Sequence, residues 1–188
     1  MPDSVHLLGL AGSLRRKSYN RALLRAAKSL APEYADFDIF DLTDMPFYNH
    51  DLEESPPEQV VKLRQAITEA DGLVLASPEY NYNPTPITKN LIDWGSRPRG
   101  EAALKGKPVM LMGASTGMIA TARAQVHIRS MLDLLDAPVL VPQVLVGRAA
   151  DKFDDDGNLT DESAHSFLEK TLRSFAEQLV ERKQENQT

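Results

Sequence analysis

The fold is decided by a stretch close to the start of the chain, Gly9-Leu10-Ala11-Gly12-Ser13-Leu14-Arg15-Arg16-Lys17-Ser18-Tyr19-Asn20. The apolar run from Val5 to Leu10 is typical of a buried strand, and the segment from Arg21 to Leu30 repeats apolar residues at helical spacing. The predicted order is therefore strand, polar loop, helix. Such a loop directs backbone N–H groups and the positive end of a helix dipole toward one point outside the sheet, so it predicts an anion site.

The side chains of this loop match a phosphate group. The loop offers hydroxyl groups, an amide and three cations, which belong to Ser13, Ser18, Asn20, Arg15, Arg16 and Lys17. A phosphate monoester carries close to two negative charges at neutral pH and accepts several hydrogen bonds. We therefore predict that the loop binds a phosphate monoester, with an ordinary charged surface loop as the alternative.

Two familiar nucleotide-binding motifs do not fit this loop. The G-x-x-x-x-G-K-[ST] motif of ATP and GTP sites, ending at Lys17-Ser18, would need glycine at Ala11 and Arg16. The dinucleotide motif G-x-G-x-x-G, starting at Gly9, would need glycine at Ala11 and Leu14. Both spacings therefore argue for a different kind of phosphate ligand.

Length and composition indicate one globular domain. The chain has 188 residues, of which 42% are hydrophobic and 26% charged, and we expect residues 1–188 to form one domain whose last residues, about 182–188, fray. The net charge of −6 argues against a nucleic-acid surface, and the absence of cysteine excludes thiolate chemistry and cysteine-ligated metals. The sequence shows no apolar leader or membrane span, so we expect a cytoplasmic protein without membrane contact.

Strand-like and helix-like segments alternate along the chain, which predicts an α/β fold. The strand-like runs are Val5 to Leu10, Phe37 to Phe40, Leu73 to Ser77, Val109 to Gly113 and Val139 to Val146. Alternation of this kind implies a doubly wound, three-layer structure in which helices cover both faces of a five-stranded parallel sheet.

Local signals predict where the helices begin and end. We expect Ser55 to cap the second helix in a capping box with Glu58, and Thr160 to cap the last helix. The third and fourth helices are expected at about Ile87 to Trp94 and Ile119 to Leu135, with Trp94 in internal packing or in a subunit contact.

Two later loops suit a planar ring. In an open parallel sheet, ligands bind beyond the carboxyl ends of the strands. The loop from Ser77 to Pro86 follows the third strand and carries two tyrosines that could lie against a ring. The loop from Gly113 to Met118 follows the fourth strand, and its small residues allow a flat ligand to approach the backbone. One phosphate loop and two ring loops suggest a mononucleotide at the sheet edge.

The combined motifs resemble those of the NAD(P)H-dependent FMN reductase family of the flavodoxin-like fold. The resemblance runs from about Val5 to Arg148 and rests on Gly12-Ser13-Leu14-Arg15 with Ser18 and Asn20, on Pro78-Glu79-Tyr80-Asn81 with Lys89-Asn90 and Asp93-Trp94, and on Ala124-Gln125. It implies the strand order 2-1-3-4-5. The chain departs from the family at Ala120 and Thr121, where a Gly-Gly pair is usual.

The resemblance also implies a cofactor, its contacts and a reaction. FMN would be bound through its phosphate by Ser13, Arg15, Ser18 and Asn20, and its ring would be lined by Pro78, Glu79, Tyr80, Asn81 and the third loop, Ser115, Thr116 and Gly117. NADPH or NADH would donate hydride, and a quinone, flavin, azo compound or metal oxyanion would accept the electrons. The flavin makes and breaks the bonds, so no catalytic side chain is expected. A homodimer or homotetramer is implied.

Two other functions are compatible with the same residues. A flavodoxin-type electron carrier would bind FMN without using NAD(P)H, but such carriers usually bind the phosphate with neutral groups. A binding module could keep the phosphate site without turnover. The four histidines, His6, His50, His127 and His165, show no metal-ligand spacing, so we expect no metal.

Overall fold

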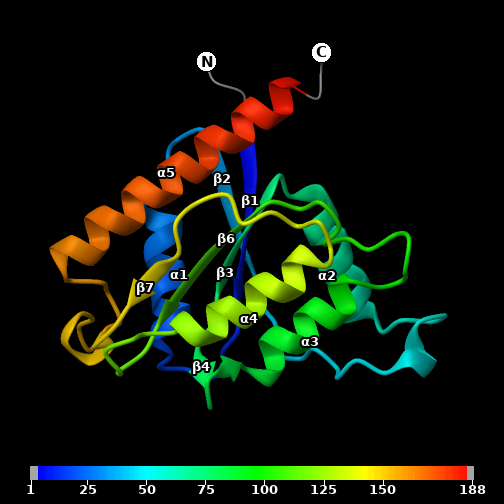
Figure 1. Ribbon diagram of the computed structural model, residues 1–188, viewed down its shortest axis with the longest axis horizontal. Coiled ribbons are helices and arrows are strands. Elements are labelled where there is room, and N and C mark those ends of the chain that lie inside the picture. Colours follow the sequence, from blue (N-terminus) through cyan, green and yellow to red (C-terminus); the bar gives the residue numbers. More distant parts are fainter. Residues whose placement is uncertain (1–3, 186–188) are drawn as a thin grey trace.

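A five-stranded parallel sheet forms the centre of the molecule in the computed structural model, which describes residues 4–185. The strands are β1 (Val5–Ala11), β2 (Ala35–Phe40), β3 (Gly72–Ala76), β6 (Val109–Ala114) and β7 (Val144–Val146). Their order in space is β2-β1-β3-β6-β7, and every neighbouring pair is parallel (Figure 1). With the strands of a separate hairpin set aside, this is the order 2-1-3-4-5, so the predicted α/β, flavodoxin-like fold is confirmed.

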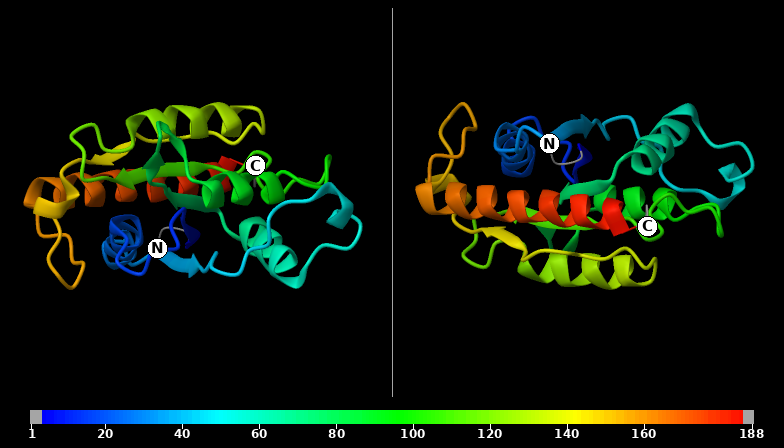
Figure 2. Two further views of the ribbon diagram at one scale, coloured as in Figure 1. Left: turned by 90° about the horizontal axis from the view of Figure 1, so that it is seen from below. Right: turned by 90° about the horizontal axis from the view of Figure 1, so that it is seen from above.

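Helices cover both faces of this sheet. They are α1 (Tyr19–Ser29), α2 (Glu58–Glu69), α3 (Pro86–Gly95), α4 (Ala122–Asp133) and α5 (Glu162–Glu185), and short 3-10 helices occur at His50–Leu52 and Ala149–Asp151. α1 and α4 lie on opposite sides of the molecule (Figure 2). Within residues 4–185, no helix combines the length and apolar character needed to cross a bilayer.

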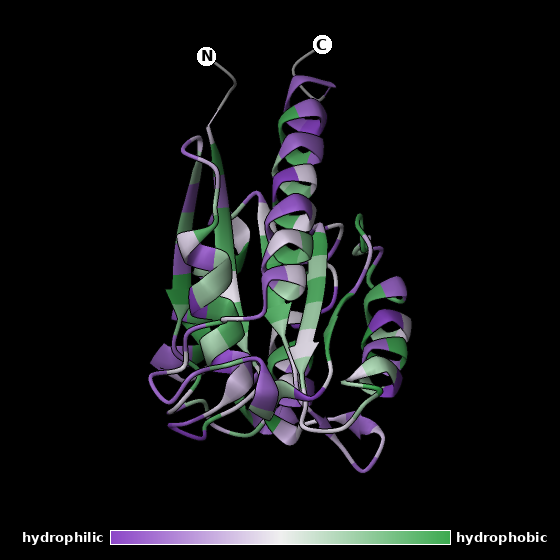
Figure 3. Ribbon diagram, turned by 90° about the vertical axis from the view of Figure 1, so that its left-hand side faces the viewer, coloured by the Kyte–Doolittle hydropathy of each residue, from purple (hydrophilic) through white to green (hydrophobic). Residues whose placement is uncertain are grey.

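The core has two halves separated by the sheet. Side chains of α1 and α5 pack with one face of the strands, and side chains of α2, α3 and α4 pack with the other. Every residue of β3 and β6 is buried, as expected for central strands with helices on both faces. Hydrophobic residues accordingly dominate these strands, whereas α5 carries polar residues on its outer side (Figure 3).

The predicted capping box of the second helix is wrong. α2 begins at Glu58, its N-cap is Pro57, and no side chain caps it. A residue that precedes proline is held in an extended conformation. Ser55 precedes Pro56, and Pro56 precedes Pro57, so neither Ser55 nor Pro56 joins the helix. The hydroxyl of Ser55 is therefore too far along the chain to act as the cap.

The last helix also starts and ends differently from the prediction. The side chain of Asp161, not that of Thr160, caps it, because Asp161 Oδ1 accepts the N–H of Ala164 at 2.8 Å. α5 extends to Glu185, so the described part of the expected frayed tail is helical. Lys183 holds this end through an ion pair of 3.0 Å with Asp71. Residues 186–188 of that tail lie outside the described residues.

Two further boundaries differ from the predicted ones. α4 begins at Ala122 rather than Ile119, because Ala120 has a φ of +55° and cannot belong to a right-handed helix. The fifth strand is shorter than the run from Val139 to Val146, since only Val144–Val146 form β7 and Val139 makes an isolated bridge to Val109. Pro142 lacks the N–H that a continuous strand would donate.

Trp94 packs in the core as predicted. Its side chain is fully buried, and its indole N–H donates to the carbonyl of Pro46 at 2.8 Å. This contact holds α3 against the segment that follows β2. The loops at the carboxyl ends of β1, β3 and β6 then meet at the lower edge of the sheet in Figure 1.

Candidate functional site

The loop after β1 is fixed at its start and open at its tip. Gly12 donates its N–H to Ala76 at 2.8 Å and accepts the hydroxyl of Thr85 at 2.6 Å. A Cβ atom on Gly12 would lie 2.0 Å from Thr88 Oγ1, so no larger residue fits there. Beyond this point, the backbone N–H groups of residues 13–17 donate to no described residue. They are therefore available to an anion.

Ser18 joins this loop to α1 and keeps a free hydrogen-bond donor. Ser18 Oγ accepts the N–H groups of Asn20 at 3.2 Å and Arg21 at 3.4 Å, which makes it the N-cap of the helix. Because the oxygen acts as the acceptor in both bonds, the hydroxyl hydrogen remains free. Ser18 can thus donate to an anion that lies at the positive end of the helix dipole.

Asn20 has a structural role that the sequence analysis missed. Its amide nitrogen donates to the carbonyl of Ala114 at 2.8 Å, and its amide oxygen accepts the N–H of Ala114 at 2.9 Å. The side chain is buried, and both of its polar groups are used at the end of β6. Asn20 lies in the wall of the site and its amide connects α1 to β6, so its contact with a phosphate stays a prediction.

The loop after β3 contains a hairpin that was not predicted. Its strands are β4 (Glu79–Tyr80) and β5 (Asn83–Pro84), which pair antiparallel. Asn81 and Tyr82 form the two-residue turn with φ values of +50° and +68°. Positive φ at both central positions is typical of a type I′ turn, whose twist suits a tight hairpin.

Glu79 attaches this hairpin to α4 through its side chain. Its Oε2 accepts the N–H groups of Arg123 at 2.9 Å and Ala124 at 3.0 Å, and its Oε1 lies 3.4 Å from the Arg123 guanidinium. A carboxylate at a helix N-terminus satisfies free N–H groups and interacts favourably with the helix dipole. The side chain of Glu79 therefore positions two loops of the site relative to each other.

The two tyrosines of the hairpin have different surroundings. Tyr80 faces the site, with 54% of the residue exposed. Tyr82 is in contact with Arg123, whose guanidinium carbon lies 4.1 Å from the ring centroid. Tyr82 thus makes a cation–π contact that strengthens the attachment to α4. Of the two expected ring contacts, only Tyr80 lies at the site.

The loop after β6 supplies the third wall. Ser115 donates its N–H to Val146 at 3.0 Å, and its Oγ accepts the N–H of Gly117 at 3.2 Å. The N–H of Thr116 donates to no described residue and is therefore available to a ligand. Ala120 takes a left-handed conformation, which glycine adopts without strain, and this explains physically why a Gly-Gly pair would suit this segment.

These three loops surround one cavity of about 390 Å³. Its lining residues are Ser13, Arg15, Ser18, Tyr19, Asn20, Pro78, Glu79, Tyr80, Ala114, Ser115 and Thr116. All the predicted site residues except Asn81 and Gly117 are among them. Asn81 lies in the hairpin turn, and Gly117 follows the part of the third loop that faces the cavity. Tyr19 and Ala114 are additions that the sequence analysis did not make.

The cavity fits FMN in size and in the chemistry of its two ends. Its volume lies in the range of about 300–1,000 Å³ that is usual for small-molecule sites. One end offers the unused N–H groups of residues 13–17, the hydroxyls of Ser13 and Ser18, and the cation of Arg15. The other end lies between the hairpin and the third loop, where Pro78 and Tyr80 present flat surfaces. A phosphate suits the first end, and a planar ring suits the second.

One possible metal-ligand group escaped the sequence analysis. Ligand atoms of His6, Asp36 and Asp38 lie within 4.8 Å of one another, because parallel pairing sets His6 of β1 opposite Asp36 of β2. Lys28 lies 3.8 Å from Asp38, and both aspartates are exposed. The group therefore resembles an exposed cluster of paired charges on the edge strand, remote from the three loops.

Comparison with known proteins agrees with this geometry. Residues 5–151 match the family model described as NADPH-dependent FMN reductase. An NAD(P)H-dependent FMN reductase of Pseudomonas aeruginosa is 40% identical over 177 residues, which cover 93% of this chain and 95% of the relative. A quinone reductase of Pseudomonas putida is 39% identical over 169 residues, covering 89% of this chain and 90% of the relative.

A solved structure supports the same conclusion. The flavoenzyme NAD(P)H:(acceptor) oxidoreductase FerB of Paracoccus denitrificans superposes with a TM-score of 0.85 and is 32% identical, covering 95% of this chain and 98% of the other. The family match spans all three loops of the cavity, and the relatives match over nearly their whole length. The chain therefore belongs to the NADPH-dependent FMN reductase family.

Proposed function

We propose that this FMN-dependent oxidoreductase, which takes hydride from NAD(P)H, delivers the electrons to small quinones at the cavity formed by its three carboxyl-end loops. The observation that carries the proposal is the division of this cavity into a cationic end rich in unused donors and a flatter end beside Tyr80. Relatives named quinone reductase, at 39% and 36% identity, support a quinone as acceptor.

The phosphate of FMN would be bound at the first loop. Ser13 and Ser18 would donate their hydroxyl hydrogens, Arg15 would supply charge, and the backbone N–H groups of residues 13–17 would complete the set of donors. Charge-assisted hydrogen bonds of this kind are about twice as strong as neutral ones. This loop would therefore supply much of the affinity for the cofactor.

The ring of FMN would lie between the hairpin and the third loop. When bound, FMN supplies the hydride-accepting chemistry, so the protein contributes position and electrostatics. The free N–H of Thr116 is a fixed donor for negative charge that develops on a ligand at this end. Glu79 and Arg123 fix the spacing of the two loops, and the exposed Tyr80 borders the open side where a second planar substrate can enter.

An anaerobic experiment tests the function. The purified protein, supplied with FMN, is expected to show the visible absorption of bound flavin. This absorption should bleach when NADPH or NADH is added and return when a benzoquinone is added. Bound flavin that NAD(P)H does not bleach would contradict the oxidoreductase, and bleached flavin that no quinone reoxidises would contradict the acceptor.

We also infer that the protein assembles as a homodimer or homotetramer through the surface beside the site. Met118, Ile119 and Val126 are 74%, 52% and 62% exposed, and they lie on α4 or on the loop before it. Burial of these apolar side chains would stabilise an assembly. Light scattering should give a multiple of 20.8 kDa, and Val126→Asp should reduce it. Val61→Asp on α2 is the control, and a monomeric native protein would contradict the inference.

A further inference from the structure

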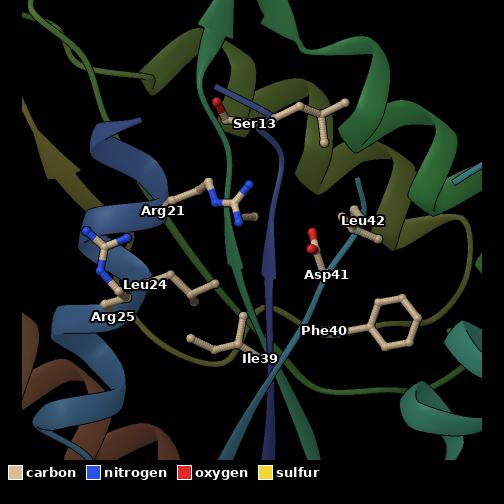
Figure 4. Close-up of a pocket in the computed structure, with 10 residues that line it drawn as sticks. Ser13, Arg21, Leu24, Arg25, Ile39, Phe40, Asp41 and Leu42 are labelled. Atoms are coloured by element: carbon tan, nitrogen blue, oxygen red, sulfur yellow. The ribbon is translucent and has the colours of Figure 1, made fainter. Parts of the chain in front are cut away.

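A second cavity adjoins the loop after β1. Its volume is about 210 Å³, and it is situated between α1 and the carboxyl ends of β1 and β2 (Figure 4). Ser13 lines both this cavity and the larger one. A ligand that occupied the smaller cavity would therefore lie directly beside the loop that we assign to the FMN phosphate.

One wall of the second cavity is apolar and accessible. Leu14, Leu24 and Ile39 line it, and Leu14 and Ile39 are 46% and 40% exposed. Leu24 and Ile39 approach each other from α1 and β2 (Figure 4). Exposed aliphatic side chains that converge on a concave surface provide a suitable contact for the face of a planar ring.

Three charged side chains line the cavity beside this wall: Arg21, Arg25 and Asp41. The guanidinium of Arg21 points into the cavity toward Asp41 (Figure 4), and its charge adds to the hydrogen bonds from Thr43 that lower the pKa of that carboxyl. Among residues 4–185, Arg21 has no ion pair within 4.0 Å and its side chain donates no hydrogen bond. Asp41 Oδ1 accepts the N–H and the hydroxyl of Thr43 at 3.1 and 2.6 Å, while its Oδ2 accepts no hydrogen bond from a described residue. The hydrogen-bond donors of Arg21 and one carboxylate oxygen of Asp41 are thus available beside the apolar wall.

The size and position of the cavity restrict the choice of ligand. Its volume is below the range of about 300–1,000 Å³ for whole small-molecule ligands, so it suits one part of a larger molecule. Asp41 directly follows β2, next to the phosphate loop. In the Rossmann dinucleotide fold, an acidic residue that follows the second strand accepts a hydrogen bond from the ribose. Asp41 has this position, although the loop after β1 lacks the G-x-G-x-x-G motif of that fold.

We propose that this cavity binds the adenosine phosphate part of a dinucleotide, an inference that rests on the proposed function because it extends the nucleotide site. The adenine ring lies on Leu14 and Ile39, a ribose hydroxyl donates to Asp41, and a phosphate accepts hydrogen bonds from Arg21. Guanidinium suits phosphate because its planar fork donates two hydrogen bonds at once. The same chemistry occurs in NAD(P)H and in FAD.

Calorimetric titration of the FMN-loaded protein with ADP tests the site without any turnover. ADP should bind, and Arg21→Gln and Asp41→Asn should each weaken its binding about ten-fold or more, the usual effect of losing a hydrogen bond to a charged group. Arg173→Gln, an exposed arginine on α5, is the matched control and should leave the affinity unchanged. Unchanged thermal unfolding midpoints would show that the variants are folded.

Three results would overturn the proposal. They are the absence of heat when millimolar ADP is added to the native protein, the same ADP affinity in all variants, and binding of inorganic phosphate as tight as that of ADP. The last result would mean that the apolar wall takes no part. ADP binding in a protein whose flavin NAD(P)H does not bleach would instead contradict the proposed function and leave this site standing.

The source of the adenosine phosphate is decided by two further measurements on Arg21→Gln. If NAD(P)H supplies it, the KM for NAD(P)H rises about ten-fold or more while kcat and the FMN affinity stay unchanged. If FAD supplies it, the apoprotein loses affinity for FAD but not for FMN. A variant that loses ADP binding without either change would exclude a dinucleotide as the ligand.

Discussion

Arg15 is the cationic side chain among the described residues that line the FMN cavity. It lines the cavity from the tip of the first loop, where the neighbouring N–H groups have no partner among the described residues. Arg15→Ala should therefore cost about 1.5–3 kcal/mol of FMN affinity, the usual range for a hydrogen bond to a charged group. Fluorescence titration of the apoprotein measures this. Arg173→Ala is the control, and an unchanged FMN affinity in Arg15→Ala would remove Arg15 from the site.

Ala120 is a residue held in a conformation that favours glycine. Its φ of +55° brings Cβ close to the following carbonyl. Ala120→Gly should raise the free energy of unfolding by about 0.5–1 kcal/mol, since relief of strain exceeds the entropic cost of glycine. Urea denaturation measures the change.

The control for Ala120 is an alanine in a right-handed helix. Ala66→Gly in α2 should lower the free energy of unfolding by about 1 kcal/mol, because glycine is a poor helix former. The two substitutions should thus have opposite signs. A destabilised Ala120→Gly protein would mean that the left-handed conformation of Ala120 carries no significant strain.

At the scale of elements, Glu79 joins the hairpin to α4. Its carboxylate accepts two backbone N–H groups at the helix N-terminus and lies beside the Arg123 guanidinium. Glu79→Gln keeps the shape but removes the charge, so it should lower the free energy of unfolding by about 1 kcal/mol and weaken FMN binding. Glu169→Gln, at an exposed ion pair on α5, is the control. Unchanged FMN binding in Glu79→Gln would show that the hairpin keeps its position without this contact.

Asn20 joins α1 to β6 across the first and third loops. Asn20→Ala would leave the buried N–H and C=O of Ala114 without this partner. Each unsatisfied buried group costs about 1–3 kcal/mol, so the free energy of unfolding should fall by several kcal/mol. Urea denaturation tests this against Asn158→Ala, whose side chain is exposed. If Asn20→Ala and Asn158→Ala lowered the free energy of unfolding equally, the hydrogen bonds between Asn20 and Ala114 would not stabilise the fold.

The sequence predicts the sheet well because the strand signals are local. Buried runs such as Val109 to Gly113 identify the central strands, and the glycine and hydroxyl residues after Val5 to Leu10 identify the first loop. The contacts of Asn20 could not be predicted in this way, since its partner Ala114 is 94 positions away. The two hydrogen bonds between the Asn20 side chain and the Ala114 backbone depend on the tertiary fold. The motif alone therefore cannot distinguish this role of Asn20 from a contact with phosphate.

The hairpin after β3 shows a second limit of sequence reasoning. Its turn lacks the glycine that usually marks a two-residue hairpin, because Tyr82 takes the second position at φ +68°. Contacts with Arg123 and α4 stabilise this turn from outside the segment. The motif Pro78-Glu79-Tyr80-Asn81 therefore identifies the correct loop but not which of its side chains face the cavity.

At the scale of the whole molecule, the loops and helix ends are held by carboxylates whose pKa values are lowered. Hydrogen bonds from the backbone of Ala164 and from Lys152 lower the pKa of Asp161, and the Thr43 hydroxyl lowers that of Asp41. The Tyr48 hydroxyl, followed by His50 and Arg97, lowers the pKa of Glu53. Asp41 and Glu53 lie in the connection between β2 and α2, and Asp161 lies just before α5, so their protonation would weaken the contacts of these two segments.

A lowered pKa in the folded state makes stability depend on pH in one direction. The stabilisation is fully present above the ordinary carboxyl pKa of about 4 and is lost as the pH falls through the lower folded-state pKa. Urea denaturation should thus give a nearly constant free energy of unfolding from about pH 7 to 5 and a decline below about pH 4. Asp161→Asn should flatten this decline, because one of the titrating groups is removed, whereas Asp155→Asn, an exposed carboxyl without a hydrogen bond from a described residue, should not. A protein equally stable at pH 3 and pH 7 would show that these contacts do not contribute to the stability of the fold.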